Sequence, residues 1–255
     1  MLESWGVASR RDLRNPPIGE ALVDLRAVPK NPLPAALEEL RNRLRDRYPK
    51  HRVVTHFEAS VEIKPGAPPA AKAALDRGPH GYFFQSADGL DIAQFRVDGF
   101  TYNRLRPYTS GPAVIAEALR LWSVFAEVLA PSMVSRVALR YLNQMTLPRV
   151  PEGYGQFLTR PPAVPVGASG RLVSFIDRVE SYDEKTGVRA ICTQASEEVP
   201  AESNSTVVLL DLDVFLLAET GILAKELEAT LHALRGLKNN LFFGAITETT
   251  VGLFE

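Results

Sequence analysis

The sequence contains very little cysteine and histidine. Cys192 is the sole cysteine among 255 residues, so one chain cannot form an internal disulfide or a zinc site made of several thiolates. The four histidines do not form a close ligand cluster in the sequence. A single unpaired cysteine fits a reducing compartment, and we expect a cytoplasmic protein without a metal site.

Net charge and long apolar runs are also missing. The formal charge is −1, so the chain as a whole does not attract phosphate backbones or anionic lipid. The first residues contain no apolar stretch of signal-peptide length, and no segment approaches the roughly 18 apolar residues of a membrane span. These observations argue against a membrane or nucleic-acid partner and leave a protein or a small molecule.

The sequence lacks the common catalytic and cofactor motifs. It has no glycine-rich loop ending in Gly-Lys-Ser/Thr, no His-Glu-x-x-His helix and no Gly-x-Ser-x-Gly elbow. Gly153-Tyr154-Gly155 lacks the third glycine of a dinucleotide-binding turn. We therefore expect no cofactor, and whether the chain is an enzyme stays open, with a non-enzymatic role favoured.

Hydrophobic periodicity predicts two similar halves. Residues 1–15 have no regular period and are expected to form a flexible N-terminal arm. Residues 16–131 and 132–255 each contain strands and helices in the order strand, helix, about three strands, helix, and are expected to pack as one unit. The expected elements are a strand at 20–28, a helix at 33–48, strands between 51 and 108, a helix at 110–129, a strand at 134–146, a short helix at 153–159, a hairpin around 183–187, a strand at 205–217, a helix from 220 and a final strand.

The predicted fold class is α+β. Tandem β-α-β-β-β-α halves would form a curved, mostly antiparallel sheet with helices on one face and the other face partly open. This order is similar to the saddle of TATA-binding-protein-like folds, a likeness that implies a fold and no activity.

Four charged residues of the second half are candidates for a site on the open face. Asp211 and Asp213 occupy alternate strand positions and therefore point to the same side, as do Arg136 and Arg140. If the two strands are neighbours, the four side chains form cross-strand ion pairs. Structural pairing, metal or phosphate chemistry and substrate recognition all remain open for this group.

A second candidate group lies in the segment 95–108. Arg96, Arg104 and Arg106 alternate with aromatic residues that include Tyr102, a mixture that binders of single-stranded nucleic acid use for stacking and phosphate contact. Aromatic residues are also favoured in strands for packing alone, so an ordinary core hairpin is the alternative.

Several segments resemble an uncharacterised, sporadically distributed bacterial family. The matching segments are PPIGEALVDLR at 16–26, FRVDGFTYNRLRPY at 95–108, LRYLNQMTLP at 139–148, LDLDVF at 210–215 and NNLFFGAIT at 239–247. The likeness covers nearly the whole chain from Pro16 onward. It implies no catalytic residue, substrate or cofactor, because none is assigned to that family.

Three hypotheses for function follow from the sequence. The first is a non-enzymatic binding or regulatory module that uses the open sheet face. The second is an enzyme of unfamiliar design with the aspartates and arginines of the second half as its polar groups. The third is nucleic-acid binding across the concave face through Arg96, Tyr102, Arg104 and Arg106. A half-covered sheet would also allow a homodimer.

Overall fold

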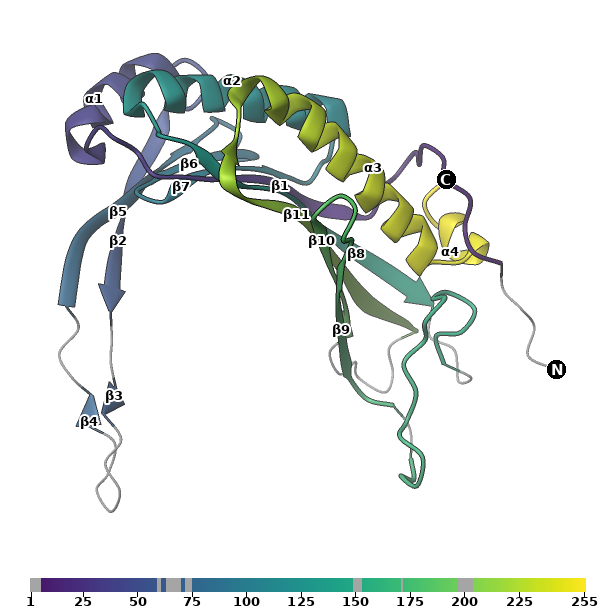
Figure 1. The fold of residues 1–255 in the computed structure, drawn as a ribbon. Helices are drawn as coiled ribbons and strands as arrows, with labels where there is room; N and C mark the ends of the chain where they lie inside the picture. The colour runs from purple at the N-terminus through teal and green to yellow at the C-terminus, as the bar shows by residue number, and fades with distance from the viewer. Residues whose placement is uncertain are drawn as a thin grey trace.

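The computed structural model describes residues 6–58, 61–62, 70–71, 75–148, 153–170, 172–196 and 204–255. It shows an α+β protein with one nine-stranded antiparallel sheet that arches beneath a layer of helices (Figure 1). The strand order across this sheet is β2-β5-β6-β7-β1-β8-β11-β10-β9.

The strands of the large sheet are β1 (Ile18–Ala27), β2 (Lys50–Glu58), β5 (Leu75–Gln85), β6 (Asp91–Arg96), β7 (Gly99–Leu105), β8 (Val134–Pro148), β9 (Phe175–Tyr182), β10 (Val188–Ser196) and β11 (Ser205–Ile222). A separate two-stranded sheet contains β3 (Val61–Glu62) and β4 (Ala70–Ala71). The helices are α1 (Leu33–Leu44), α2 (Gly111–Leu129), the 3₁₀ turn η1 (Ala224–Glu226), α3 (Leu227–Ala245) and α4 (Glu248–Val251).

Both halves of the chain place their first strand at the centre of the sheet. β1 pairs with β8, and Val23 lies opposite Leu139 in this central register. The last strand of each half lies next to its first: β7 pairs with β1, and β11 pairs with β8. The predicted α+β class, the mostly antiparallel sheet and the helices on one face are confirmed.

Helix α2 shows how local sequence sets the helical layer. The side chain of Ser110 accepts a hydrogen bond from the Ala113 N–H at 3.2 Å, and Pro112 occupies the first turn, where its missing N–H is not needed. The helix ends at Ala130, which adopts the left-handed conformation with φ 46°. The buried face of α2 packs over the centre of the sheet in the largest core cluster.

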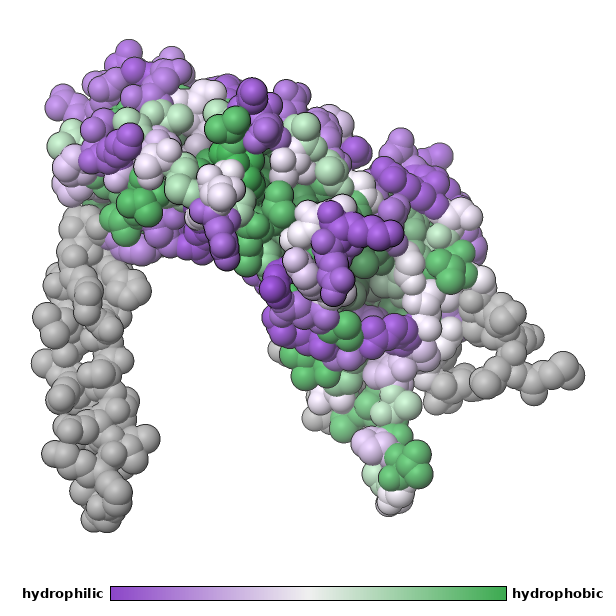
Figure 2. Space-filling view, in the orientation of Figure 1, coloured by the Kyte–Doolittle hydropathy of each residue, from purple (hydrophilic) through white to green (hydrophobic). Residues whose placement is uncertain are grey.

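An aromatic cluster fills the space between α2 and the first half of the sheet. Phe95 lies 5.5 Å from Phe100 and 5.8 Å from Phe125 between ring centroids, and all three rings are fully buried. Such contacts favour a single arrangement of strand and helix, because aromatic pairs prefer offset or edge-to-face geometry. Figure 2 shows hydrophobic side chains between the helices and the sheet and many hydrophilic ones over the outer helical surface.

Three expected elements of the second half differ from the structure. The expected helix at 153–159 is a turn, because Leu158 pairs with Ile246 and the prolines after Arg160 disfavour helix there. The expected helix start at residue 220 is replaced by an extension of β11, since Ile222 pairs with Val134. The expected final strand at the tail is wrong as well: α3 continues to Ala245, and Thr247 caps the short helix α4.

The face of the sheet opposite the helices is uncovered by any helix of the described chain (Figure 1). No helix among the described residues has the length and apolar character needed to cross a membrane.

Candidate functional site

The open sheet face carries an ionic network centred on Asp24 of β1. Arg96 from β6 and Arg136 from β8 each approach a carboxylate oxygen of Asp24 at 2.9 Å, and Arg26 does so at 3.1 Å. The Thr101 hydroxyl donates to the same carboxylate at 2.8 Å. Four strands are therefore linked through one buried side chain.

Of the four charged residues predicted in the second half, Arg136 and Asp213 join this network, and Arg140 and Asp211 form a separate pair beside it. Arg136 also contacts Asp213 at 3.2 Å, and Arg140 binds Asp211 with its Nε at 2.8 Å. The expected cross-strand ion pairs are present, because β8 and β11 are neighbours. These arginines are thus paired to carboxylates within the sheet and offer an external phosphate few free charges.

The pKa values of two of these acids shift in opposite directions, although burial raises both. Burial raises the pKa of Asp24, but the hydrogen bonds from Arg96 and Thr101 outweigh it and leave the pKa below its usual value. For Asp213, burial dominates over the nearby Arg136 and Arg140 and raises the pKa. One carboxylate oxygen of Asp213 is buried without a hydrogen-bond partner.

The predicted aromatic and arginine group of segment 95–108 is divided between different surfaces. Arg96 lies on the open face, whereas Tyr102 and Arg104 point to the helical side, where Tyr102 donates to Asp91 at 2.6 Å and Arg104 contacts the other oxygen of that carboxylate at 2.8 Å. Arg106 follows β7 and donates to the backbone carbonyls of residues 17 and 18. The expectation that all four line the concave face is corrected. Arg96 pairs with Gly99 across the β6–β7 hairpin and therefore shares a face with Thr101, whereas Tyr102 and Arg104 occupy the alternate positions of β7.

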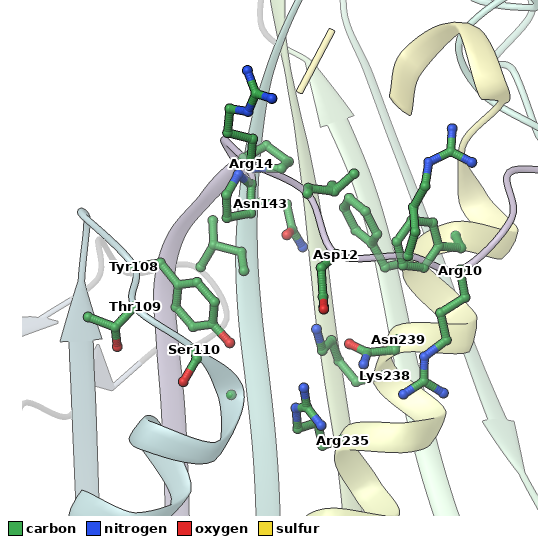
Figure 3. A pocket seen from close by; sticks show the side chains of 18 of the residues that line it. Arg10, Asp12, Arg14, Tyr108, Thr109, Ser110, Asn143, Arg235, Lys238 and Asn239 are labelled. Atoms are coloured by element: carbon green, nitrogen blue, oxygen red, sulfur yellow. The ribbon is translucent and has the colours of Figure 1, made fainter. Parts of the chain in front are cut away.

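A cavity with a volume of about 710 Å³ lies on the helical side. Its walls are residues 10–14 of the arm, the following Pro16 and Pro17, the start of α2, the second half of α3 and Asn143 of β8 (Figure 3). This volume suits a small molecule, since ligand pockets commonly enclose about 300–1,000 Å³.

The arm forms one wall because it is attached to the end of the chain. Val7 forms a bridge with Thr247, and the Ser9 N–H donates to the carboxylate of Glu248 at 2.6 Å. Arg11 binds the other oxygen of Glu248 at 2.5 Å. Farther along, the Asn15 N–H donates to the Phe254 carbonyl at 2.9 Å, so residues 10–14 are held at both ends.

Positive charge is concentrated around this cavity. Its described lining contains five cationic side chains and one acidic side chain, Asp12. The cationic residues are Arg10, Arg11, Arg14, Arg235 and Lys238. Arg11 is neutralised by Glu248 and Glu255, whereas the other four make no hydrogen bond or ion pair with any described residue.

Arg235 lies against the N-terminus of α2. A side-chain carbon added at Gly111 would be 2.7 Å from the Arg235 Cδ, so the arginine packs directly on the first helical residue. The N-terminal end of a helix carries partial positive charge, and the first turn of α2 contains no acidic residue. Two positive groups thus lie side by side at the cavity wall, an arrangement that an anion in contact with both would stabilise.

Lys238 is the most buried cationic group of the lining. Its residue surface is 6% exposed, and its Nζ lies 4.0 Å from the ring centre of Tyr141. Burial, followed by the charges of Arg235 and Arg10, lowers the pKa of Lys238 to about 7. An anion in the cavity would reverse part of this shift by favouring the charged ammonium.

Tyr108 lines the cavity near α2, and the fully buried Tyr141 of β8 lies next to it. The hydroxyl of Tyr108 lies 3.3 Å from that of Tyr141, and burial raises the pKa of both. Both hydroxyls therefore stay protonated at neutral pH and can donate a hydrogen bond. Figure 3 shows the Tyr108 hydroxyl, Asp12 and the side chains of Arg235 and Lys238 pointing into the same space.

The sequence analysis did not identify Lys238 or Arg235. A signal was present: Lys238 follows Leu231 and Leu234 at the spacing of the apolar stripe of α3, and Phe242 continues that stripe. A lysine at a stripe position is buried when the helix packs. The cavity itself depends on contact between the two ends of the chain, which no local pattern indicates.

The lining is suited to hold an anion. Guanidinium, ammonium and helix-terminal groups donate to carboxylate or phosphate oxygens, whereas a metal ion needs oxygen, nitrogen or sulfur ligands in a cluster. The described residues contain no group of three or more histidine, cysteine or acidic side chains able to hold a metal ion. No family model matches the chain, and no curated protein matches it either.

Proposed function

We propose that this protein is a binding module for a small anionic ligand, which enters the cavity between the arm, α2 and α3. The observation that carries the proposal is the convergence of Arg235, Lys238 and the N-terminus of α2 on one cavity without a compensating partner among the described residues. Buried cations are normally paired, because an unpaired charge loses its hydration without compensation.

Carboxylate or phosphate is the favoured head group of the ligand. Arg235 can offer two parallel N–H donors, which match the oxygens of either group. Arg10 and Arg14 of the arm add positive charge at the cavity mouth. The size of the cavity favours a metabolite over a polymer.

The expected alternatives have less structural support. An enzyme using Asp211, Asp213, Arg136 and Arg140 would need groups free to act on a substrate, but these side chains are paired with one another or with Asp24. Nucleic-acid binding through segment 95–108 would need its cations and aromatic rings on one surface, and they are divided between two.

Isothermal titration calorimetry of the full chain with pyrophosphate, phosphate and citrate tests the proposal. We expect one site for at least one of these anions. Arg235→Gln should weaken that affinity about tenfold or more, because a charge-assisted hydrogen bond contributes about 1.5–3 kcal/mol. Lys225→Gln removes a cation from η1, outside the cavity, and should leave the affinity unchanged. Absence of binding for all three anions, or an equal loss in both variants, would contradict the proposal.

A further inference from the structure

Lys238 is placed as a reactive amine. It occupies a buried position of α3 and lines the cavity, yet no described carboxylate or other acceptor binds its Nζ. Its closest described partner is the face of the Tyr141 ring, which can attract a cation and cannot accept the amine's N–H bonds as a carboxylate would. A purely structural lysine in this position would be expected to have an acidic partner.

The environment of Lys238 keeps much of the amine neutral. Burial and the two arginines nearby lower its pKa to about 7, so a large fraction is uncharged under ordinary conditions. Desolvated lysines beside another cationic group are the ones that attack carbonyl carbons and form Schiff bases.

Arg235 lies one helical turn before Lys238 and lines the same cavity. Residues three apart on a helix are neighbours, with about 5–6 Å between their Cβ atoms. A ligand whose carboxylate and carbonyl are adjacent can therefore bind Arg235 with the first group and present the second to Lys238.

We infer that Lys238 forms an imine with a 2-oxo acid whose carboxylate is held by Arg235 and the N-terminus of α2. This inference rests on the proposed anion site and names its ligand class. The Nζ lone pair attacks the carbonyl carbon, a C–N bond forms, and the electron pair of the C=O π bond moves to oxygen, which takes up a proton. Nitrogen loses one proton to give the carbinolamine.

Loss of water completes the reaction. The carbinolamine oxygen is protonated and leaves as water when its C–O bond breaks, while the nitrogen lone pair forms the C=N bond of an iminium ion. The iminium nitrogen then loses its remaining proton, which returns the proton taken up by the oxygen and gives the imine. The sum is one amine plus one ketone giving one imine and one water, without an oxidant or reductant. Tyr108 lines the cavity with a protonated hydroxyl that can donate to the carbonyl oxygen, and Asp12 is the acidic lining residue that can accept a proton.

Trapping with pyruvate and cyanoborohydride tests the inference. The full chain is incubated with both reagents, and intact mass and peptide mapping locate the reduced adduct. We expect one adduct per chain, at Lys238, formed faster as pH rises through about 7 as the amine becomes neutral. Lys238→Arg should give no adduct, whereas Lys225→Arg, which alters an exposed lysine outside the cavity, should behave as the unmodified chain.

Competition separates the imine from the anion site and needs no variant. Pyrophosphate should suppress the adduct in the unmodified chain if both use the cavity. Pyrophosphate binding without a pyruvate adduct would overturn the imine and leave the anion site standing. Absence of both would overturn both, and labelling spread equally over exposed lysines would overturn the imine.

Discussion

Gly111 provides the space that the side chain of Arg235 occupies at the start of α2. A methyl group at Gly111 would approach the Arg235 Cδ to 2.7 Å and would overlap its Nε, so the guanidinium would have to leave the helix end. This relationship allows the position of Arg235 to be changed without changing its charge.

Gly111→Ala should therefore weaken anion binding several-fold while the protein stays folded. Alanine favours helix over glycine by about 1 kcal/mol, and this gain opposes the cost of displacing the Arg235 side chain. The net change in unfolding free energy should therefore be small. Calorimetric titration with pyrophosphate and urea denaturation measure the two effects. Gly236→Ala is the matched control, because an added carbon there meets no atom within 4 Å; equal affinity in the two variants would argue against a role for Arg235.

Anion affinity should decrease as pH rises above about 7. Burial lowers the pKa of Lys238 to about 7 in the free protein, and a bound anion favours the charged form, so binding takes up a proton in this range. The charged groups that line the cavity with Lys238 include Arg235 of α3 and Arg10 and Asp12 of the arm, and its Nζ lies over the ring of Tyr141.

The loss of affinity should approach about tenfold per pH unit above the pKa, because one proton is linked to binding. Titrations from about pH 6 to about pH 9 with an anion that does not itself titrate there, such as sulfate, measure it. Lys238→Gln should remove the pH dependence. A dependence of unchanged slope in that variant would assign the proton to another group.

Glu248→Gln should weaken anion binding because it loosens the attachment of the arm. The Glu248 carboxylate accepts a hydrogen bond from the Ser9 N–H and binds Arg11. The hydrogen bond from Ser9 is the main cause of the lowered pKa of this carboxyl. Loss of the charge weakens both contacts, and the arm residues that line the cavity become less ordered. We expect a several-fold lower affinity and faster proteolysis within residues 7–15. Glu184→Gln, in an exposed hairpin, should change neither.

Asp24→Asn and Asp213→Asn should differ strongly in stability. The lowered pKa of Asp24 means that its stabilisation is present above the unfolded value of 3.8 and is lost as pH falls through the folded pKa. Removal of this charge leaves three arginines without their shared partner and should cost about 3 kcal/mol or more at neutral pH.

The pKa of Asp213 is raised, so its charge affects stability in the opposite direction from that of Asp24. Its charged form is disfavoured in the folded state, so the associated penalty is fully present above the folded pKa and diminishes as pH falls toward 3.8. Asp213→Asn should therefore change the unfolding free energy by less than about 1 kcal/mol. Urea denaturation measures the unfolding free energy of both variants. Equal destabilisation would contradict the prediction and show that the two acids contribute alike.

The sequence predicted the sheet and the helical layer well where local pattern and long-range packing agree. The leucine stripe of α1, the Ser110 cap of α2 and the turns at Gly89 and Gly99 each act within a few residues, and the structure contains all of them. Cross-strand pairing of Arg136 and Arg140 with the aspartates of β11 followed from strand alternation once the strands were neighbours.

The rest depends on contacts between distant segments. β11 extends to Ile222 because Val134 pairs with it, although the local sequence favours a helix start. The cavity is lined by residues near the amino-terminal end of the chain, by the start of α2 and by α3, which are far apart in the sequence. Local periodicity also assigned Lys238 no role. Its position in the apolar stripe of α3 indicates that the side chain is buried, but does not indicate whether an acidic side chain lies beside it.

The bridge between Val7 and Thr247 links the amino-terminal and carboxyl-terminal segments into one cooperative unit. Opening of either segment releases the other, because their backbone hydrogen bonds are shared. A ligand that contacts the arm would then slow amide hydrogen exchange along α4, at backbone groups that it never touches, and truncation of the last residues would be felt as a loss of affinity at the cavity.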